Sequence, residues 1–170
     1  MLLLPERCYA AGAVREDWAI RLDGGRITAA GPRATMAPSA GEPSGSDGDV
    51  VHLPGRLLLP GGVNAHNHSF QSLLRGLGDD LDFMGWRDRV LYPFSRRLGV
   101  RGIEIGAAFA FAEMLRHGIT TVVDFFYVQD GGNANAESAI RAAKRVGIRL
   151  VLTRAFYDWS GAPPEYRETV

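Results

Sequence analysis

Two histidines separated by one residue, His66 and His68, stand at the end of an apolar run that begins at Leu57. Residues i and i+2 of a β-strand point to the same side, so the two imidazoles can reach one metal ion together. Neutral imidazole suits zinc, iron or nickel. Packed or solvent-facing histidines are the alternative, but the chain has only 4 histidines, and these two follow a buried-type strand and a Pro-Gly-Gly turn. The spacing therefore predicts metal ligation by His66 and His68.

A metal at this position points to hydrolysis. Zinc lowers the pKa of its bound water to roughly 7 and supplies hydroxide that attacks an electron-poor carbon such as C=O or C=N. A catalytic zinc normally needs three protein ligands besides the water, and this strand gives two. His52 precedes the strand, and His117 ends a helix that feeds the next one. We therefore expect both at the amino ends of the strands, below the site, with His117 interacting favourably with the helix C-terminal dipole. The catalytic residues stay unassigned.

The elements that position the pair follow from the apolar pattern. Three apolar strands are expected at residues 57–68, 119–128 and 148–156, with helices at about 100–117 and from Asn133 or Asn135, as the cap, to about 146. Strands that are apolar on both faces and alternate with helices indicate parallel β/α units. Residues 69–98 are expected to form a loop with short helices. Residues 18–30 are expected to form a β-hairpin, and residues 32–49, which are rich in proline, glycine and serine, a further loop.

Composition limits the class of protein. The 170 residues are 46% hydrophobic and 22% charged, which is ordinary for a soluble globular protein. With 19 basic and 19 acidic residues, nothing indicates nucleic acid or a charged membrane surface as a partner. No stretch approaches the ~20 apolar residues of a membrane helix, and the N-terminus lacks the features of a signal peptide. The single cysteine, Cys8, is interpreted as a packed residue and fits a reducing cytoplasm.

Several motifs together resemble one family. Pro60-Gly61-Gly62-Val63-Asn64-Ala65-His66-Asn67-His68 resembles the first metal-binding strand of the amidohydrolase superfamily. Phe70-Gln71, the Leu-Leu-Arg-Gly-Leu run at 73–77 and Trp86 are similar to its cyclic-amidine and nucleobase deaminase branch. Residues 113–124 resemble the second β/α step of that branch, and residues 23–32 resemble the small β-sandwich before its barrel. The resemblance covers nearly the whole chain.

The resemblance implies a fold and a reaction. The fold is α/β, the start of a (β/α)8 TIM-like barrel preceded by part of a small β-sandwich, with residues 1–56 in the sandwich and 57–170 in the first three β/α units. The reaction is hydrolysis of a non-peptide carbon–nitrogen bond, often deamination, with a divalent metal for which we favour zinc over iron. The family holds this metal with His-x-His, two later histidines and an aspartate on later strands. This sequence departs from the pattern because those strands are not in it.

The resemblance also implies contacts to a small-molecule substrate. Gln71 can hydrogen-bond an amidine or ring amide. Arg75 can bind a carboxylate or brace its loop, and Trp86 can wall the pocket or belong to the core. Asp124 can orient a ligand histidine, although capping of the strand end is favoured. Weaker candidates at the third strand are Arg154 and Asp158, whereas Phe125, Phe126 and Tyr127 are expected in the core.

The number of strands predicts how the chain behaves. Three parallel strands cannot close a barrel and leave two unpaired edges. We therefore expect the isolated chain to be poorly stable, to aggregate, or to associate as a homo-oligomer or with a partner chain. The favoured interpretation is the N-terminal portion of a metal-dependent deaminase or related hydrolase, inactive alone. One half of a two-chain enzyme and a non-catalytic binding or assembly module on the same fold are the alternatives.

Overall fold

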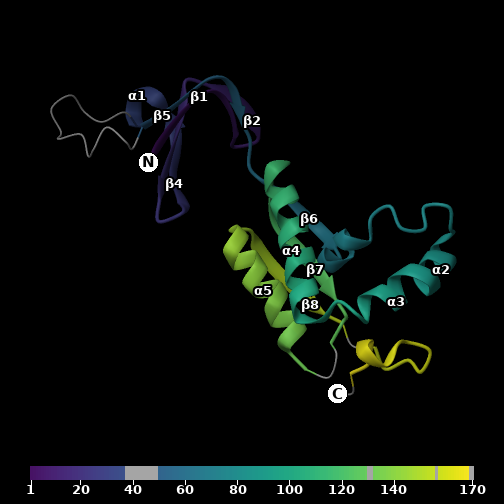
Figure 1. Ribbon diagram of the computed structural model, residues 1–170. Helices are drawn as coiled ribbons and strands as arrows, with labels where there is room; N and C mark the ends of the chain where they lie inside the picture. The colour runs from purple at the N-terminus through teal and green to yellow at the C-terminus, as the bar shows by residue number, and fades with distance from the viewer. Residues whose placement is uncertain (37–49, 130–131, 156, 169–170) are drawn as a thin grey trace. The chain divides into compact units, whose positions relative to one another are not determined.

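The computed structural model describes residues 1–36, 50–129, 132–155 and 157–168 (Figure 1). The chain divides into two compact units, Met1–Pro60 and Gly61–Val170. Residue 56, where we expected the domain boundary, lies inside a strand of the first unit. That boundary is therefore found a few residues later, after Pro60.

The first unit is a five-stranded mixed sheet. Four strands lie in the order β2-β1-β3-β4, and β5 pairs in parallel with β1. The predicted hairpin is confirmed, because β3 and β4 pair antiparallel from Trp18↔Pro32 to Asp23↔Arg26. A short helix, α1 (Arg33–Met36), places Met36 on Leu2 and Ala19 in a small core. The strands are β1 Leu2–Ala10, β2 Ala13–Glu16, β3 Trp18–Asp23, β4 Arg26–Pro32 and β5 Val50–Leu58.

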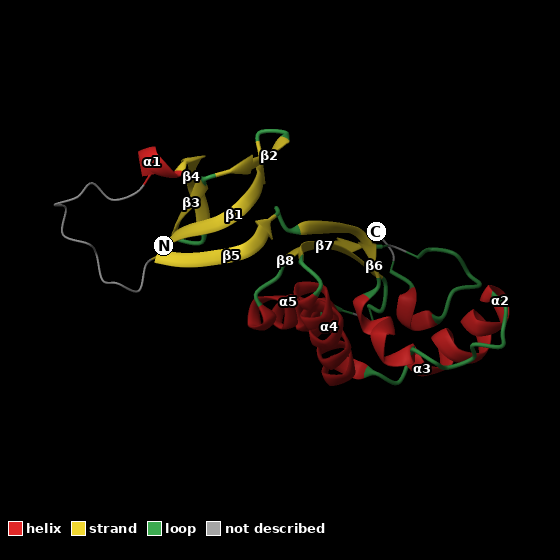
Figure 2. Ribbon diagram, turned by 90° about the horizontal axis from the view of Figure 1, so that it is seen from above, coloured by secondary structure: helices red, strands yellow, loops and turns green. Residues whose placement is uncertain are grey.

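The second unit is built on a three-stranded parallel sheet in the order β6-β7-β8. Its strands are β6 Gly62–Asn67, β7 Ile119–Phe126 and β8 Arg149–Arg154. Helices α4 (Gly99–Arg116) and α5 (Ala134–Val146) connect them and lie together on one face of the sheet (Figure 2). The predicted strand–helix–strand–helix–strand order is confirmed. Both helices end as expected, with Gly118 at φ +79° and Gly147 at φ +88°.

Short helical segments fill the chain between β6 and α4, as the sequence predicted. They are the 3-10 helix η1 (Ser69–Leu74), α2 (Phe83–Trp86), the π-helical turn η2 (Arg87–Leu91) and α3 (Tyr92–Ser95). A further 3-10 turn, η3 (Pro164–Tyr166), lies near the C-terminus. The core joins these segments to the sheet and to α4 and α5 through buried residues such as Phe70, Ile103, Phe111, Val122, Phe126, Ala139 and Tyr166.

Two local expectations need correction, and part of two others is untested. The apolar run 57–68 is not one strand, because Leu57 and Leu58 pair with Arg7 and Cys8 in the first unit. Asn133 occupies the N-cap of α5 without a capping hydrogen bond, and Asn135 instead donates to the carbonyl of Val128. Residues 37–49 of the predicted loop, and Phe156 of the predicted third strand, lie outside the described residues.

The two faces of the parallel sheet differ in their cover. Val122 pairs with Asn64 and Leu150 and is buried beneath the helices. The neighbouring register positions point to the opposite face, where Val63 is 65% exposed and Val151 is 53% exposed. Parallel sheets are normally covered on both faces. Within the part of the chain that the structure describes, the face opposite α4 and α5 is therefore largely uncovered.

Candidate metal centre

The side chains of His66 and His68 converge at the carboxyl end of β6. Their Nε2 atoms lie 3.2 Å apart. Two nitrogens at that separation, each about 2.0–2.1 Å from one zinc ion, would subtend an angle of about 100° at the metal, close to tetrahedral. The pair therefore fits a shared metal ion. Ligation itself stays a prediction.

A backbone carbonyl of β7 selects the tautomer of the neutral His68 ring. Its Nδ1 lies 2.7 Å from the carbonyl oxygen of Phe125. A carbonyl only accepts, so Nδ1 carries the proton and donates it, which leaves a lone pair on Nε2. That lone pair faces His66. A metal-binding histidine usually donates its other ring N–H in this way.

A bulge in β6 lies beside the pair. Asn64 is opposite Val122 and Asn67 is opposite Asp124, so β6 has one residue more than β7 over this stretch. The amide N–H of His66 donates to the Oδ1 of Asn64 at 3.2 Å. Bulges often lie next to active sites, where they redirect a side chain. The sequence analysis did not identify Asn64 as a supporting residue.

Asp124 secures the chain on both sides of His68. Its Oδ1 accepts the amide of Ser69 at 2.7 Å and the Nδ2 of Asn67 at 3.1 Å, and its Oδ2 accepts the hydroxyl of Ser69 at 2.6 Å. The side chain is fully buried. Burial raises the pKa of the Asp124 carboxyl, and the bonds from Ser69 and Asn67 act against that rise. Asp124 contacts neither imidazole directly, so it holds the strand end, as the favoured expectation had it.

An aromatic pocket of about 250 Å³ adjoins the histidine pair. The ring centroid of His68 lies 5.5 Å from that of Phe125 and 5.2 Å from that of Tyr127. Tyr127 in turn packs on Tyr166 at 4.9 Å. The other aromatic lining residues are Phe83, Trp86, Tyr92 and Tyr157. Six of these aromatic side chains are tyrosine or phenylalanine, so the pocket presents mainly ring faces and edges to a ligand.

Two of the three residues expected to contact substrate lie at this pocket. Gln71 lines it and donates from Nε2 to the hydroxyl of Tyr127, and Trp86 also lines it. Arg75 does not line it. Its guanidinium makes a bidentate pair with Glu113 and lies over the ring of Phe109 at 5.2 Å. Arg75 instead lines a groove of about 520 Å³ that also includes His66 and Glu113.

The structure describes both remaining histidines, and His117 ends α4 just before β7, as the sequence predicted. His52 is exposed on β5, in the first unit. His117 is the C-cap of α4, and its Nδ1 donates to the carbonyl of Glu113 at 2.8 Å. Across residues 1–36, 50–129, 132–155 and 157–168, no group of three or more His, Cys, Asp or Glu side chains could hold a metal ion. A metal ion held by His66 and His68 would therefore need further ligands, beyond the side chains that the structure describes.

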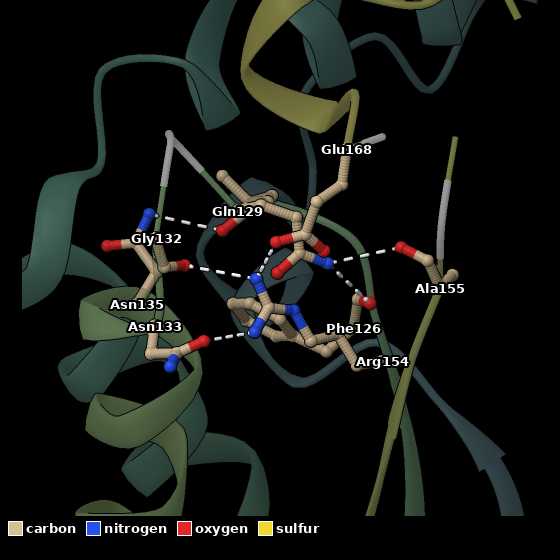
Figure 3. A network of polar contacts seen from close by, with 9 residues as sticks. Phe126, Gln129, Gly132, Asn133, Asn135, Arg154, Ala155 and Glu168 are labelled. Atoms are coloured by element: carbon tan, nitrogen blue, oxygen red, sulfur yellow. Dashed lines mark hydrogen bonds and ion pairs between the residues drawn. The ribbon is translucent and has the colours of Figure 1, made fainter. Parts of the chain in front are cut away.

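Arg154, a weaker candidate, is engaged in a structural network at the end of β8 (Figure 3). It pairs with Glu168 and Asn133 and donates to the carbonyl of Gly132 at 3.3 Å. Beside it, the buried amide of Gln129 donates to the carbonyl of Ala155 at 3.1 Å. These contacts join the segments that follow β7 and β8. Asp158 is exposed.

Sequence reasoning missed part of the pocket. Phe126 and Tyr127 are buried in the core, as expected, but Tyr127 and the partly buried Phe125 also line the pocket beside the histidines. The two-residue period of β7, continued by Tyr127 directly after it, carries this signal, because Phe125 and Tyr127 share one side and Phe126 takes the other. Tyr157 and Tyr166 come from the segment after β8, and no local pattern marks them. The hydroxyl of Tyr166 bonds the buried Oγ of Ser95, which ties that segment to α3.

The fold and the histidine pair define a parallel α/β protein with two imidazoles at the carboxyl end of its first parallel strand. Residues 57–170 match the model of the amidohydrolase family. The chain belongs to the amidohydrolase family.

Individual relatives are consistent with this family. A 5-methylthioadenosine/S-adenosylhomocysteine deaminase of Nitratidesulfovibrio vulgaris is 36% identical over 147 residues, which are 86% of this chain and 30% of the relative. A zinc-bound adenosine deaminase from Xanthomonas campestris is 28% identical with a TM-score of 0.66, covering 88% of this chain and 32% of that one. A zinc complex of atrazine chlorohydrolase from Arthrobacter aurescens is 23% identical with a TM-score of 0.73 over 99% of this chain and 39% of that one, a likeness of fold.

The chain spans about a third of the length of the relatives it matches. In the described residues, none of the helices combines the length and apolar character needed to cross a membrane.

Proposed function

We propose that this chain carries the first metal-binding strand of a zinc-dependent hydrolase that cleaves non-peptide carbon–nitrogen bonds, by deamination of a cyclic amidine or a similar small molecule. The observation that carries the proposal is the convergence of the Nε2 atoms of His66 and His68, 3.2 Å apart, at the mouth of an aromatic pocket. Two of the relatives support it, because they are named as deaminases of adenosine and of related nucleosides.

The donor set fits zinc. His66 and His68 would hold the ion through Nε2, and the carbonyl of Phe125 keeps the proton of His68 on Nδ1. Zinc, when bound, supplies a water activated for attack near neutral pH. The proposed cytoplasmic location is compatible with the single cysteine of the chain.

The pocket residues bind and orient the substrate in this proposal. The rings of Phe125, Tyr127 and Trp86 favour a planar heteroaromatic ring and exclude water from it. Gln71 hydrogen-bonds the amidine or ring amide. Burial raises the pKa of Tyr127, so its hydroxyl stays protonated and neutral beside Gln71. Arg75 would have to leave Glu113 to reach a substrate carboxylate, so we favour a bracing role for it.

The rest of the site is proposed to come from further polypeptide. We infer that β6, β7 and β8 begin a (β/α)8 barrel, and that the first unit is part of a small β-sandwich. The parallel order, the helices on one face and the exposed Val63 and Val151 on the other support this. The missing ligands would lie on later strands, in a longer protein or in a partner chain. The isolated chain is then inactive.

Zinc binding tests the proposal. The chain is dialysed against millimolar zinc and the bound metal is measured by elemental analysis, beside His66→Asn, His68→Asn and the control His52→Asn. We expect measurable bound zinc, at most one ion per chain, in the wild type and in His52→Asn, and its loss in both other variants. No bound zinc in the wild type, or equal zinc in His66→Asn and His68→Asn, would refute the metal site.

A further inference from the structure

Asp124 is a fully buried carboxylate that no arginine or lysine pairs with in the part of the chain that the structure describes. Its three hydrogen bonds come from neutral donors, the Nδ2 of Asn67 and the amide and hydroxyl of Ser69. Burying such a group costs free energy unless all its oxygens are hydrogen-bonded. All three donors belong to the two residues that flank His68. The hydrogen bonds that offset the burial of the Asp124 carboxylate are therefore all made with the two residues next to His68.

The neighbouring residue of β7 acts on the same histidine. Asp124 holds the backbone around His68, while the carbonyl of Phe125 holds its Nδ1 at 2.7 Å. Consecutive residues of one strand thus set both the position of the chain and the rotation of the ring. The side chains of Asp124 and Phe125 point to opposite faces of the sheet. The Asp124 carboxylate therefore reaches Ser69 from the helix side, and the His68 ring stays on the pocket side.

The bulge in β6 explains why this restraint is needed. The register between Asn64 and Asn67 departs from a regular ladder, so ladder bonds alone do not fix this end of β6. The side chains of Asn64 and Asp124 bond to the backbone there instead. Without the Asp124 side chain, the segment from Asn67 to Ser69 would keep the register pairing of Asn67 but lose three hydrogen bonds.

We propose that Asp124 is a positioning residue for the metal centre, which holds the segment from Asn67 to Ser69 so that the Nε2 of His68 meets that of His66. This inference rests on the proposed function, because a shared metal is the reason for the convergence. Asp124 acts through Ser69 and Asn67 and touches neither the metal nor the substrate.

Two variants and one matched control test the role. Asp124→Asn keeps the size of the side chain but removes the charge and one acceptor. Ser69→Ala removes only the hydroxyl bond and keeps the amide bond. Ser138→Ala is the control, because Ser138 is also fully buried and also loses one short hydroxyl bond, to the carbonyl of Asn135 at 2.6 Å, at a site remote from His68 in sequence.

The first readout needs no metal. Nitrogen-15 NMR of the imidazole rings in the metal-free chain reports which nitrogen of His68 carries the proton. We expect the Nδ1–H form in the wild type and in Ser138→Ala, and a mixture of tautomers in Asp124→Asn. The second readout is zinc affinity, which should fall roughly 10- to 100-fold in Asp124→Asn, less in Ser69→Ala and not in Ser138→Ala.

The outcomes separate this inference from the proposed function. If Asp124→Asn keeps the tautomer and zinc affinity of the wild type and loses only stability, as Ser138→Ala does, Asp124 is merely structural and the inference is wrong. If Asp124→Asn does not fold, Ser69→Ala decides by the same two readouts. If the wild type binds no zinc but Asp124→Asn still changes the His68 tautomer, the metal site fails while the positioning of His68 stands.

Discussion

The contact between α4 and η1 gives the sharpest test of the packing behind the histidines. Gly106 lies in the middle of α4, and a Cβ at this position would meet the carbonyl oxygen of Phe70 at 3.0 Å, its Cα at 3.1 Å and the Cγ of Leu73 at 3.2 Å. Two of these atoms are backbone and cannot rotate away. The carbonyl of Gly106 also accepts the hydroxyl of Ser72 at 2.7 Å. A side chain here would push η1, which carries Gln71, away from α4.

Two opposing effects set the size of the change in Gly106→Ala. Alanine in a helix interior is favoured over glycine by about 1 kcal/mol. Overpacking against a rigid neighbour typically costs about 1–3 kcal/mol. We take a value near the middle of that range, because three atoms are crowded and two are fixed. The expected net result is a loss of about 1 kcal/mol in the free energy of unfolding.

Urea unfolding followed by circular dichroism measures the change, with all variants at one protein concentration because association shifts apparent stability. Ala112→Gly is the matched control, since Ala112 is exposed on the same helix. It should destabilise by about 1 kcal/mol through helix propensity alone. If Gly106→Ala stabilises the chain by the amount that Ala112→Gly destabilises it, the close approach of α4 and η1 is absent and the reasoning is refuted.

Two further predictions concern charge and association. Glu113 has its pKa lowered by the hydrogen bond from Arg75. Between the lowered pKa and 4.5, the ordinary pKa of the group, the unfolded chain therefore binds more protons than the folded one. The pair with Arg75 stabilises the folded chain above pH 4.5. This stabilisation is lost as the pH falls through the lowered pKa. Comparing Arg75→Met with the wild type across pH should show a small difference that vanishes in acid; one that grows in acid would contradict the pairing. The uncovered sheet face, with exposed Val63 and Val151, predicts that the chain self-associates or binds a partner chain. A monomer by light scattering, together with a sharp thermal transition that does not depend on concentration, would overturn this prediction.

Much of the second unit could be predicted because its signals are local. Gly118 and Gly147 mark helix ends by themselves, and the i, i+2 spacing of His66 and His68 predicts that the two rings lie on one side of an extended strand. The start of the first parallel strand could not be predicted. Leu57 and Leu58 are apolar enough for either sheet, and only pairing with β1 assigns them to the first unit.

The pocket was harder to predict than the histidine pair, for a physical reason. Tyr157 and Tyr166 lie about 90 residues or more after His68 along the chain, and they reach the pocket through the bond between Tyr166 and Ser95 and the ion pair between Glu165 and Arg96. Asn133 shows the same limit, since its Oδ1 accepts from Arg154 rather than from the first turn of α5. Tertiary contacts compete with local ones for the same polar atoms. A short stretch of sequence shows only the local hydrogen-bond partners, so it does not predict the tertiary ones.

The placement of the site reflects the difference between the two faces of the sheet. On the helix side, Asp124 and Phe126 are buried and the packing is continuous with α4 and α5. On the other side, Phe125 stacks with His66 at 5.9 Å beside the uncovered strands. The rigid side therefore fixes the backbone that carries the histidines, while their Nε2 atoms face the side that is left open. A metal held there would keep coordination positions free for a substrate and for ligands from further polypeptide, which is what hydrolysis at a shared metal requires.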